Sequence, residues 1–237
     1  MFDHIKGVIF DMDGTLLDSM HIWRQIDEDF LAGRGLPMRE DLQRQIEGMS
    51  MIQTAAWFRE TYQLPETIED LTEIWNAMAK EAYEKTIETK PYAMELLHVL
   101  RERGYALAIA TSNSRALVEA SFSKNHLDRL VSVCITSDEI PRGKPAPDIY
   151  LRAADDLSLD PARCLVFEDI LPGIHAAKAS GMRVCAVEDA YSAQIRDQKR
   201  READYFVYDF KEALSVLESR TQVTNGPTDS KRGSEEK

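Results

Sequence analysis

The stretch that most constrains the fold lies close to the start of the chain. Residues 8–10, Val-Ile-Phe, are three consecutive large apolar residues, which is typical of a short strand buried on both faces. Two carboxylates, Asp11 and Asp13, follow this strand directly, and Gly14 comes next. Burying an ionised carboxylate is costly unless something compensates its charge. The pattern therefore indicates a cation site or a catalytic site, at the sheet edge where open α/β folds bind ligands.

Three interpretations of this stretch compete. The simplest is a strand that leads into a turn, because Asp-Gly is a common turn dipeptide. The second is an EF-hand calcium loop starting at Asp11, which needs an oxygen ligand at its fifth position, glycine at its sixth and glutamate at its twelfth. The chain has Thr15, Leu16 and Ile22 at these positions, which excludes the calcium loop. The third is a nucleophilic aspartate beside an aspartate that transfers protons, with Mg²⁺ between them.

Composition limits the class of protein and its partners. The 237 residues, 43% hydrophobic and 30% charged, are typical of a globular protein with one large domain or two small ones. The net charge of −12 repels nucleic-acid backbones and anionic membranes, so we expect neither as a partner. No apolar run reaches membrane-spanning length and no signal-peptide pattern is present, so we expect a cytoplasmic protein. We also expect a monomer. Cys134, Cys164 and Cys185 lie in strand-like runs and are expected to be buried free thiols.

Periodicity divides the chain into an insertion and a core. Residues 19–89 contain helical patterns and no convincing strand, and Ser50 and Thr67 are expected to cap two of the helices. From residue 90 to residue 218, short apolar runs alternate with helical patterns, which predicts a parallel sheet with helices on both faces. The strands expected after the first one are residues 106–110, 131–135, 164–167, 184–187 and 205–207.

We therefore expect an α/β fold with an inserted helical domain. A Rossmann-like parallel sheet flanked by helices would comprise residues 1–18 and 90–218, and residues 19–89 would form an all-helical cap. After residue 218 the composition is polar and charged, which predicts a disordered tail over residues 219–237.

Polar side chains follow several of the predicted strands. Parallel strands end at the same edge of a sheet, so groups that follow different strands are expected to meet. These groups are Asp11 and Asp13 after the first strand, Thr111, Ser112 and Asn113 after the second, and Glu168 and Asp169 after the strand that ends at Phe167.

Simpler explanations exist for the later groups. Residues 111–114 could merely cap a helix, although a capped helix N-terminus also binds anions. Glu168 and Asp169 could cap the helix that starts near Pro172. Lone lysines are usually solvated, but two prolines stiffen the loop that carries Lys144. The Gly-Lys pair at residues 143–144 is not a P-loop, because Asp138 stands where the first glycine would be.

In combination, these groups resemble the four motifs of the haloacid dehalogenase superfamily, in the family's order and with compatible spacing, over residues 5–218. The helical insertion resembles the cap of the subgroup that contains β-phosphoglucomutase and phosphoglycolate phosphatase. Dehalogenases of this superfamily lack the second aspartate, so Asp13 indicates phosphoryl chemistry. The first motif is Asp11-Met12-Asp13, the second Thr111, the third Lys144 and the fourth Glu168-Asp169.

The resemblance implies a Mg²⁺-dependent phosphatase that hydrolyses a small phosphorylated metabolite. Asp11 would form an aspartyl-phosphate, while Asp13 would protonate the leaving oxygen and then deprotonate the attacking water. The carboxylates of Asp11 and Asp169 and the backbone carbonyl of Asp13 would hold Mg²⁺, with Glu168 bound to it or behind it. The groups expected to bind the phosphoryl oxygens are Lys144, Thr111 and amides near Ser112 and Asn113.

Two departures bear on the reaction. β-Phosphoglucomutases have a histidine in the first cap helix and an arginine after the cap-loop glycine, and this chain has Trp23 and Met51 in those places. A mutase must hold a bisphosphate with a second phosphate clamp, and none is evident, so hydrolysis is favoured. A phosphomutase is the alternative, and an inactive binding or regulatory protein on the same fold is a further one. The cap residues that select the substrate, and the substrate itself, are not fixed by the motifs.

Overall fold

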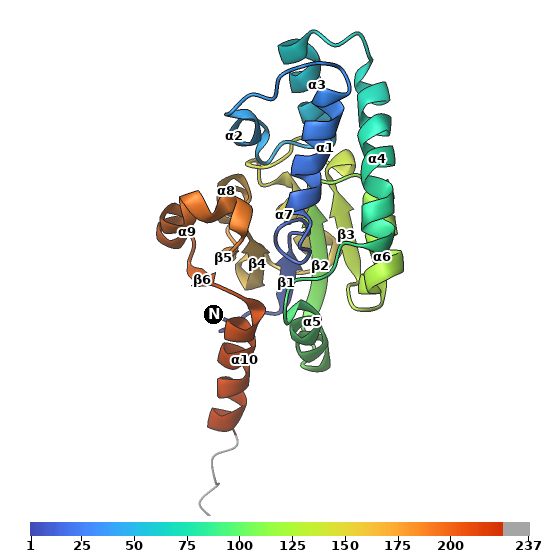
Figure 1. The fold of residues 1–237 in the computed structure, drawn as a ribbon. Helices are drawn as coiled ribbons and strands as arrows, with labels where there is room; N and C mark the ends of the chain where they lie inside the picture. Colours follow the sequence, from blue (N-terminus) through green and yellow to red (C-terminus); the bar gives the residue numbers. More distant parts are fainter. Residues whose placement is uncertain (225–237) are drawn as a thin grey trace, which may run out of the picture.

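The computed structural model describes residues 1–224 and contains a six-stranded parallel sheet in the order β3-β2-β1-β4-β5-β6. The first strand therefore lies inside the sheet, between the second and the fourth (Figure 1). This arrangement confirms the expected α/β fold with a parallel sheet flanked by helices. The strands are β1 (Gly7–Phe10), β2 (Ala106–Thr111), β3 (Val133–Thr136), β4 (Cys164–Glu168), β5 (Arg183–Val187) and β6 (Tyr205–Val207).

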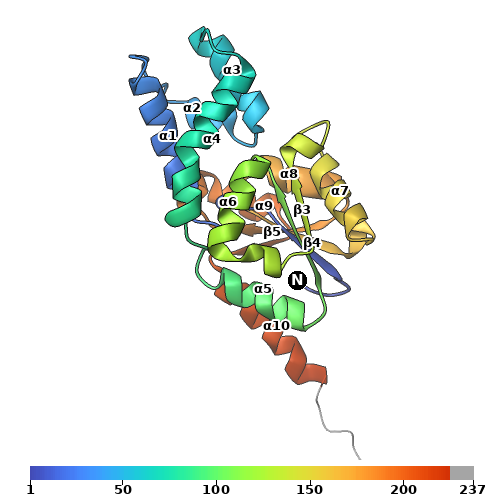
Figure 2. The same cartoon turned by 90° about the vertical axis from the view of Figure 1, so that its right-hand side faces the viewer.

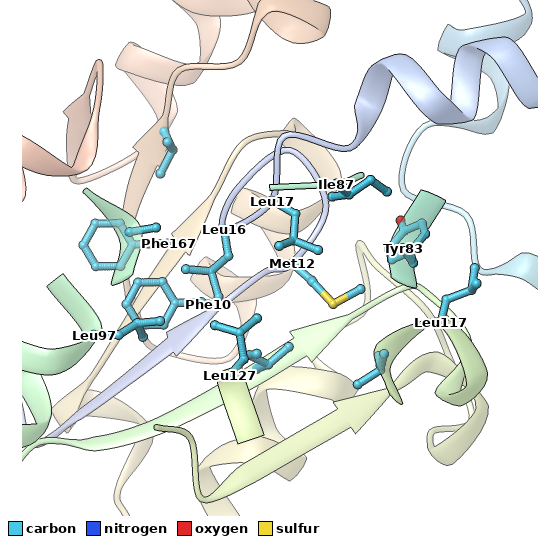
Figure 3. Packing of buried hydrophobic residues seen from close by; sticks show 14 of the residues in the cluster. Phe10, Met12, Leu16, Leu17, Tyr83, Ile87, Leu97, Leu117, Leu127 and Phe167 are labelled. Carbon is cyan, nitrogen blue, oxygen red and sulfur yellow. The ribbon is translucent and has the colours of Figure 1, made fainter. Parts of the chain in front are cut away.

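Alternation along β1 places its side chains in two hydrophobic clusters, one on each face of the sheet. Val8 and Phe10 belong to the cluster that includes residues of α5, α6 and α10, whereas Ile9 belongs to the cluster with residues of α7 and α8. Phe10 stacks on Phe167 with a centroid separation of 5.0 Å, and Figure 3 shows the two rings side by side. The helices of the core are α5 (Ala93–Glu102), α6 (Arg115–Asn125), α7 (Asp148–Asp156), α8 (Leu171–Ala179), α9 (Arg196–Glu202) and α10 (Phe210–Thr224).

The segment between β1 and α5 forms four helices and contributes no strand to the sheet. The helices lie over the end of the sheet at which the strands terminate (Figures 1 and 2). Ser50 and Thr67 begin the third and fourth of them with capping boxes, as the sequence predicts. The four helices are α1 (Met20–Ala32), α2 (Leu42–Ile46), α3 (Met51–Tyr62) and α4 (Ile68–Lys85).

Some local expectations differ from the structure. Helix α10 continues to Thr224, so residues 219–224 are helical and the expected tail does not begin at residue 219. Residues 225–237, for which disorder is expected, lie outside the described residues. Ser114 precedes α6 without capping it through its side chain, because its hydroxyl donates to Asn76 Oδ1 of α4 at 2.7 Å. No helix within residues 1–224 is long and apolar enough to cross a membrane.

Short 3₁₀ helices complete the fold, and residues of one of them, η4 (Ala190–Ile195), line the cavity of the candidate site. The segment between β5 and α9 was not predicted as helical, because no apolar periodicity marks it. All three cysteines are free thiols, with Cys164 and Cys185 buried and Cys134 half-buried. The 3₁₀ helices are η1 (Leu127–Arg129), η2 (Ser137–Glu139), η3 (Pro161–Arg163) and η4 (Ala190–Ile195).

Candidate active site

The register of the sheet brings the predicted site residues together. Phe10 lies opposite Ile109 of β2 and Phe167 of β4, so the residues that follow these strands leave the sheet side by side. These residues line one side of a cavity of about 510 Å³ between the sheet edge and the inserted helices. We call this side, formed at the sheet edge, the floor of the cavity. Glu168 lies behind this floor and is fully buried. The predicted residues that line the cavity are Asp11, Asp13, Thr111, Ser112, Asn113, Lys144 and Asp169.

Lys144 is buried between two carboxylates. Its Nζ lies 2.5 Å from Asp11 Oδ1 and 2.5 Å from Glu168 Oε1. Burial lowers the pKa of Lys144, but Asp11 and Glu168 outweigh burial and hold this pKa well above its ordinary value. The lysine is therefore a fixed positive charge next to Asp11, and not the solvated surface lysine of the simpler explanation.

Three buried carboxylates form a group that could hold a metal ion. Oxygens of Asp11, Glu168 and Asp169 lie within 4.8 Å of one another. If all three carboxylates are ionised, Lys144 supplies one positive charge against three negative charges, which leaves a net charge of −2 for a cation to neutralise. Burial, with Glu168 adding to it, raises the pKa of Asp169 to about 8, although the Thr15 hydroxyl donates to Asp169 Oδ1 at 2.8 Å. An all-oxygen donor set with this net charge suits a hard divalent cation such as Mg²⁺.

Two glycines make room for these carboxylates. Gly14 has a φ of +80°, and a Cβ atom there would lie 2.2 Å from Asp169 Oδ2. A Cβ atom at Gly173, in the first turn of α8, would lie 1.7 Å from Glu168 Oε1. The acidic group therefore fits only against bare backbone.

Asp13 is outside the metal-capable group, and its carboxylate is held by other side chains. Ser19 donates to Asp13 Oδ1 at 2.7 Å, and Asn113 Nδ2 donates to Asp13 Oδ2 at 3.0 Å. Tyr83 of α4 also donates its hydroxyl to Asp13 Oδ1. Burial, together with the Asp13 charge, raises the pKa of Tyr83 well above its ordinary value, so the phenol stays protonated. Trp23 of α1 in turn donates to the Tyr83 hydroxyl at 2.9 Å.

The loop after β2 is also braced. The Asn113 backbone N–H donates to Thr111 Oγ1 at 3.1 Å, and the Ser112 carbonyl accepts from Ser137 at 2.9 Å. The loop leads into the N-terminus of α6, where anions are favoured. In this arrangement the Asn113 side chain contacts Asp13, which adds a positioning contact to the anion-binding role expected for this residue.

Several residues of the site have no clear signal in the sequence. Tyr83 lies in the buried stripe of α4 with Leu71, Trp75 and Ala79, at the four-residue spacing of a core face. Nothing in that spacing distinguishes a tyrosine that packs from one whose hydroxyl reaches Asp13. Tyr150 similarly lies on the buried face of α7 while its hydroxyl donates to Glu168 Oε1 at 3.0 Å.

The inserted helices supply the rest of the cavity wall. Trp23 and Met51 both line the cavity, as do Trp75 and Met49. Among the described cap residues that line the cavity, one charged residue is buried, and this is Asp27 of α1. Other cap residues in the lining are Met20, Arg24, Glu40, Gln43, Arg44, Ile46, Glu47, Gly48 and Thr54.

Known proteins share this architecture. The sequence profile of the haloacid dehalogenase-like hydrolases matches residues 8–187. The bifunctional riboflavin kinase/FMN phosphatase of Arabidopsis thaliana is 36% identical over 183 residues, which are 76% of this chain and 48% of that protein. The chain thus spans about half the length of this relative.

Two bacterial CbbY proteins match over more of their length. Protein CbbY of Rhodobacter capsulatus is 33% identical over 199 residues, covering 79% of this chain and 87% of the relative. The crystal structure of a CbbY mutant from Rhodobacter sphaeroides in complex with xylulose-(1,5)bisphosphate has a TM-score of 0.78 at 25% identity. The match covers 87% of this chain and 95% of the CbbY chain. The chain belongs to the haloacid dehalogenase-like hydrolase family and is a phosphoric monoester hydrolase of that family.

Proposed function

We propose that the chain hydrolyses a small phosphorylated metabolite in a Mg²⁺-dependent reaction, through an aspartyl-phosphate on Asp11. The observation that carries this proposal is the position of Asp11 on the cavity floor, 2.5 Å from the Lys144 ammonium and inside the acidic group. We further propose that residues 19–89 act as a cap over a core of residues 1–18 and 90–218. The helical insertion that roofs the cavity supports this division.

Asp11 would act as the nucleophile. A carboxylate oxygen attacks phosphorus, the bond from phosphorus to the leaving oxygen breaks, and the phosphoryl group is transferred to Asp11. Lys144 fixes the Asp11 carboxylate and brings positive charge to the phosphoryl oxygens, and Thr111 and Ser112 face the same floor. In such loose transition states, positioning and charge neutralisation supply most of the rate acceleration.

Asp13 would transfer the protons. As a carboxylic acid it donates a proton to the leaving oxygen, and as a carboxylate it then takes a proton from the water that hydrolyses the aspartyl-phosphate. Ser19, Tyr83 and Asn113 would be positioning residues, because they hold the Asp13 carboxylate at the cavity without lying in the acidic group.

The acidic group fits the metal that the family uses. Asp11 and Asp169 would hold Mg²⁺ with the backbone carbonyl of Asp13. Glu168, behind the floor, would add a third negative charge close to the ion. Bound there, Mg²⁺ supplies positive charge that stabilises the transferring phosphoryl group.

The lining of the cavity favours hydrolysis over mutase chemistry. Among the described residues that line the cavity, the basic ones are Lys144, Arg24 and Arg44. Lys144 is engaged by Asp11 and Glu168, while Arg24 and Arg44 are exposed and Arg24 pairs with Glu28 at 2.9 Å. No buried cation is therefore offered by these cap residues to clamp a second phosphate.

Two substitutions test the mechanism, with p-nitrophenyl phosphate as the substrate. We expect Asp11→Asn to abolish both turnover and covalent phosphate, whereas Asp13→Asn should slow turnover by roughly 100- to 10,000-fold and accumulate phosphorylated protein. Acid-quenched samples analysed by intact-protein mass spectrometry measure the covalent phosphate.

The control for this test is Asp128→Asn, an exposed aspartate outside the cavity lining, which should behave as wild type. Wild-type rates in both site variants would refute the assignment. Turnover of p-nitrophenyl phosphate excludes an inactive binding protein, and product analysis with a sugar monophosphate separates phosphate release from a mutase product.

A further inference from the structure

A carboxylate without a counter-ion lies in the cap half of the cavity. Asp27 of α1 is 6% exposed and lines the cavity. Its Oδ2 accepts a hydrogen bond from Gln43 Nε2 of α2 at 2.7 Å, and no basic side chain among the described residues pairs with it. Its second oxygen, Oδ1, has no hydrogen-bond partner in the described part of the chain.

This carboxylate differs from the buried carboxylates of the floor. Asp11 and Glu168 have Lys144, and Asp169 lies in a group that suits a divalent cation. Asp27 has one neutral amide. Burial raises its pKa to about 6, so at neutral pH the side chain is mostly ionised and its charge is poorly compensated. An acceptor atom at the cavity wall that has no protein partner can accept a hydrogen bond from a donor that enters the cavity.

Among the described cap residues that line the cavity with Asp27, no buried cation is present. Trp23, Met51 and Trp75 line the cavity from three cap helices and offer large apolar surfaces. The two arginines of the lining are exposed, so they do not neutralise a charge placed deep in the cavity. An anionic group that entered beside ionised Asp27 would meet a like charge with no buried cation of the described cap residues to offset it, which is unfavourable.

Building on the proposed function, we infer that Asp27 recognises the leaving group of the substrate. The substrate is a phosphomonoester whose leaving group presents a hydroxyl or N–H donor to Asp27 Oδ1 and carries no second phosphate there. The phosphate lies on the floor with Asp11 and Lys144, and the donor lies in the cap half. Asp27 thus determines specificity and takes no part in the transfer of the phosphoryl group.

The test compares substrates that differ at the far end of the leaving group. Values of kcat/KM are measured with p-nitrophenyl phosphate and with a panel of sugar, polyol and nucleoside monophosphates, for wild type and for Asp27→Asn. Asparagine keeps the volume and an acceptor for Gln43 but removes the charge. We expect kcat/KM for the best donor-bearing monophosphate to fall about 10- to 100-fold, the range for a hydrogen bond to a charged group. With p-nitrophenyl phosphate, which has no donor, the change should stay within about twofold.

Two sources of the donor are separated within the same panel. Glucose 6-phosphate and glucosamine 6-phosphate differ by one hydroxyl and one ammonium group. A preference for the amino sugar that disappears in Asp27→Asn identifies an ammonium donor, and equal sensitivity of the two substrates identifies a hydroxyl donor. Either result supports recognition by Asp27.

The matched control is Asp29→Asn. Asp29 lies on the same helix, is exposed, and also accepts a hydrogen bond from a glutamine, Gln25, at 2.9 Å, but it does not line the cavity. Its selectivity should equal that of wild type. Equal losses on all substrates in Asp27→Asn would overturn the inference, and so would a wild-type preference for glucose 1,6-bisphosphate over its monophosphates. Absence of any Asp11-dependent hydrolysis of p-nitrophenyl phosphate would instead refute the proposed function.

Discussion

Replacing Asp27 with asparagine should stabilise the protein. The pKa of this carboxyl is about 6 in the folded chain against an ordinary value of 3.8, because burial outweighs the hydrogen bond from Gln43. A difference of about 2 pKa units, at about 1.4 kcal/mol each, means that ionised Asp27 costs about 3 kcal/mol of folding free energy at neutral pH. Asparagine resembles the protonated carboxyl and does not have this cost.

The cost depends on pH in a defined direction. The folded chain binds this proton more tightly than the unfolded chain, so the stability that the protonated group provides is full below about pH 4 and is lost as the pH rises through about 6. The advantage of Asp27→Asn should therefore be about 3 kcal/mol at pH 7.5, about half of that at pH 5, and close to zero below pH 4. For a chain of this size, 3 kcal/mol corresponds to roughly 6–12 °C in Tm.

Tryptophan fluorescence is a suitable probe for this measurement. All three tryptophans, Trp23, Trp57 and Trp75, lie within residues 19–89, so their emission reports on the unfolding of the segment that contains Asp27. Urea titrations at pH 7.5 and pH 5 give the free energy of unfolding for wild type, Asp27→Asn and the exposed control Asp29→Asn, which should change stability by less than about 0.5 kcal/mol. An advantage below about 0.5 kcal/mol at pH 7.5, or one that does not shrink at pH 5, would refute the assigned burial cost.

Other predictions concern the metal, the proton-transfer residue and the cap. EDTA should abolish phosphate release and Mg²⁺ should restore it, and Mg²⁺ should also raise Tm because it binds the folded state; full activity in metal-free buffer would contradict the metal requirement. Tyr83→Phe should lower kcat about 10-fold with little change in KM, as partial loss of acid–base catalysis predicts, and an unchanged kcat would remove Tyr83 from the positioning of Asp13. Gly173→Ala should abolish activity and lower Tm, because the new methyl group would lie 1.7 Å from Glu168 Oε1; a wild-type Tm would mean that the loop shifts without cost. Met51→Arg places a cation in the cavity lining and should raise kcat/KM for a sugar bisphosphate relative to its monophosphate, without changing the Mg²⁺ requirement; an unchanged ratio would mean that this side chain packs only inside the cap.

The core of the site could be predicted because parallel strands impose a simple geometry. Strands β1, β2 and β4 are adjacent, so Asp11, Thr111 and Asp169, which stand near their ends, had to meet once the strands were assigned. Lys144 lies in a loop far from them in sequence, and its position came from the family motif, since a lone lysine gives no geometric signal.

The contributions of the inserted helices could not be predicted in the same way. Helical periodicity specifies which face is buried, and it does not specify what the buried face meets. Tyr83 has the spacing of a core residue, but its hydroxyl donates a hydrogen bond to Asp13. Asp27 lies at a buried position where an apolar residue would be expected. A charged residue at the buried face of a helix is the signal that could have identified Asp27.

The stability and selectivity of Asp27→Asn bear on each other. A carboxylate that is buried beside one neutral amide lowers stability at every pH above about 4, and by its full cost above about 6, while asparagine fills the same space and can still accept the bond from Gln43. Residues that lower stability in this way are typical of binding and catalytic sites, where side chains are positioned to contact a ligand even though this position destabilises the fold. If Asp27→Asn is more stable and less selective, the cost of burial is explained by the donor that Asp27 binds. If the Asp27→Asn variant is more stable and equally selective, Asp27 has no role in recognition, and other residues of the cavity must bind the leaving group of the substrate.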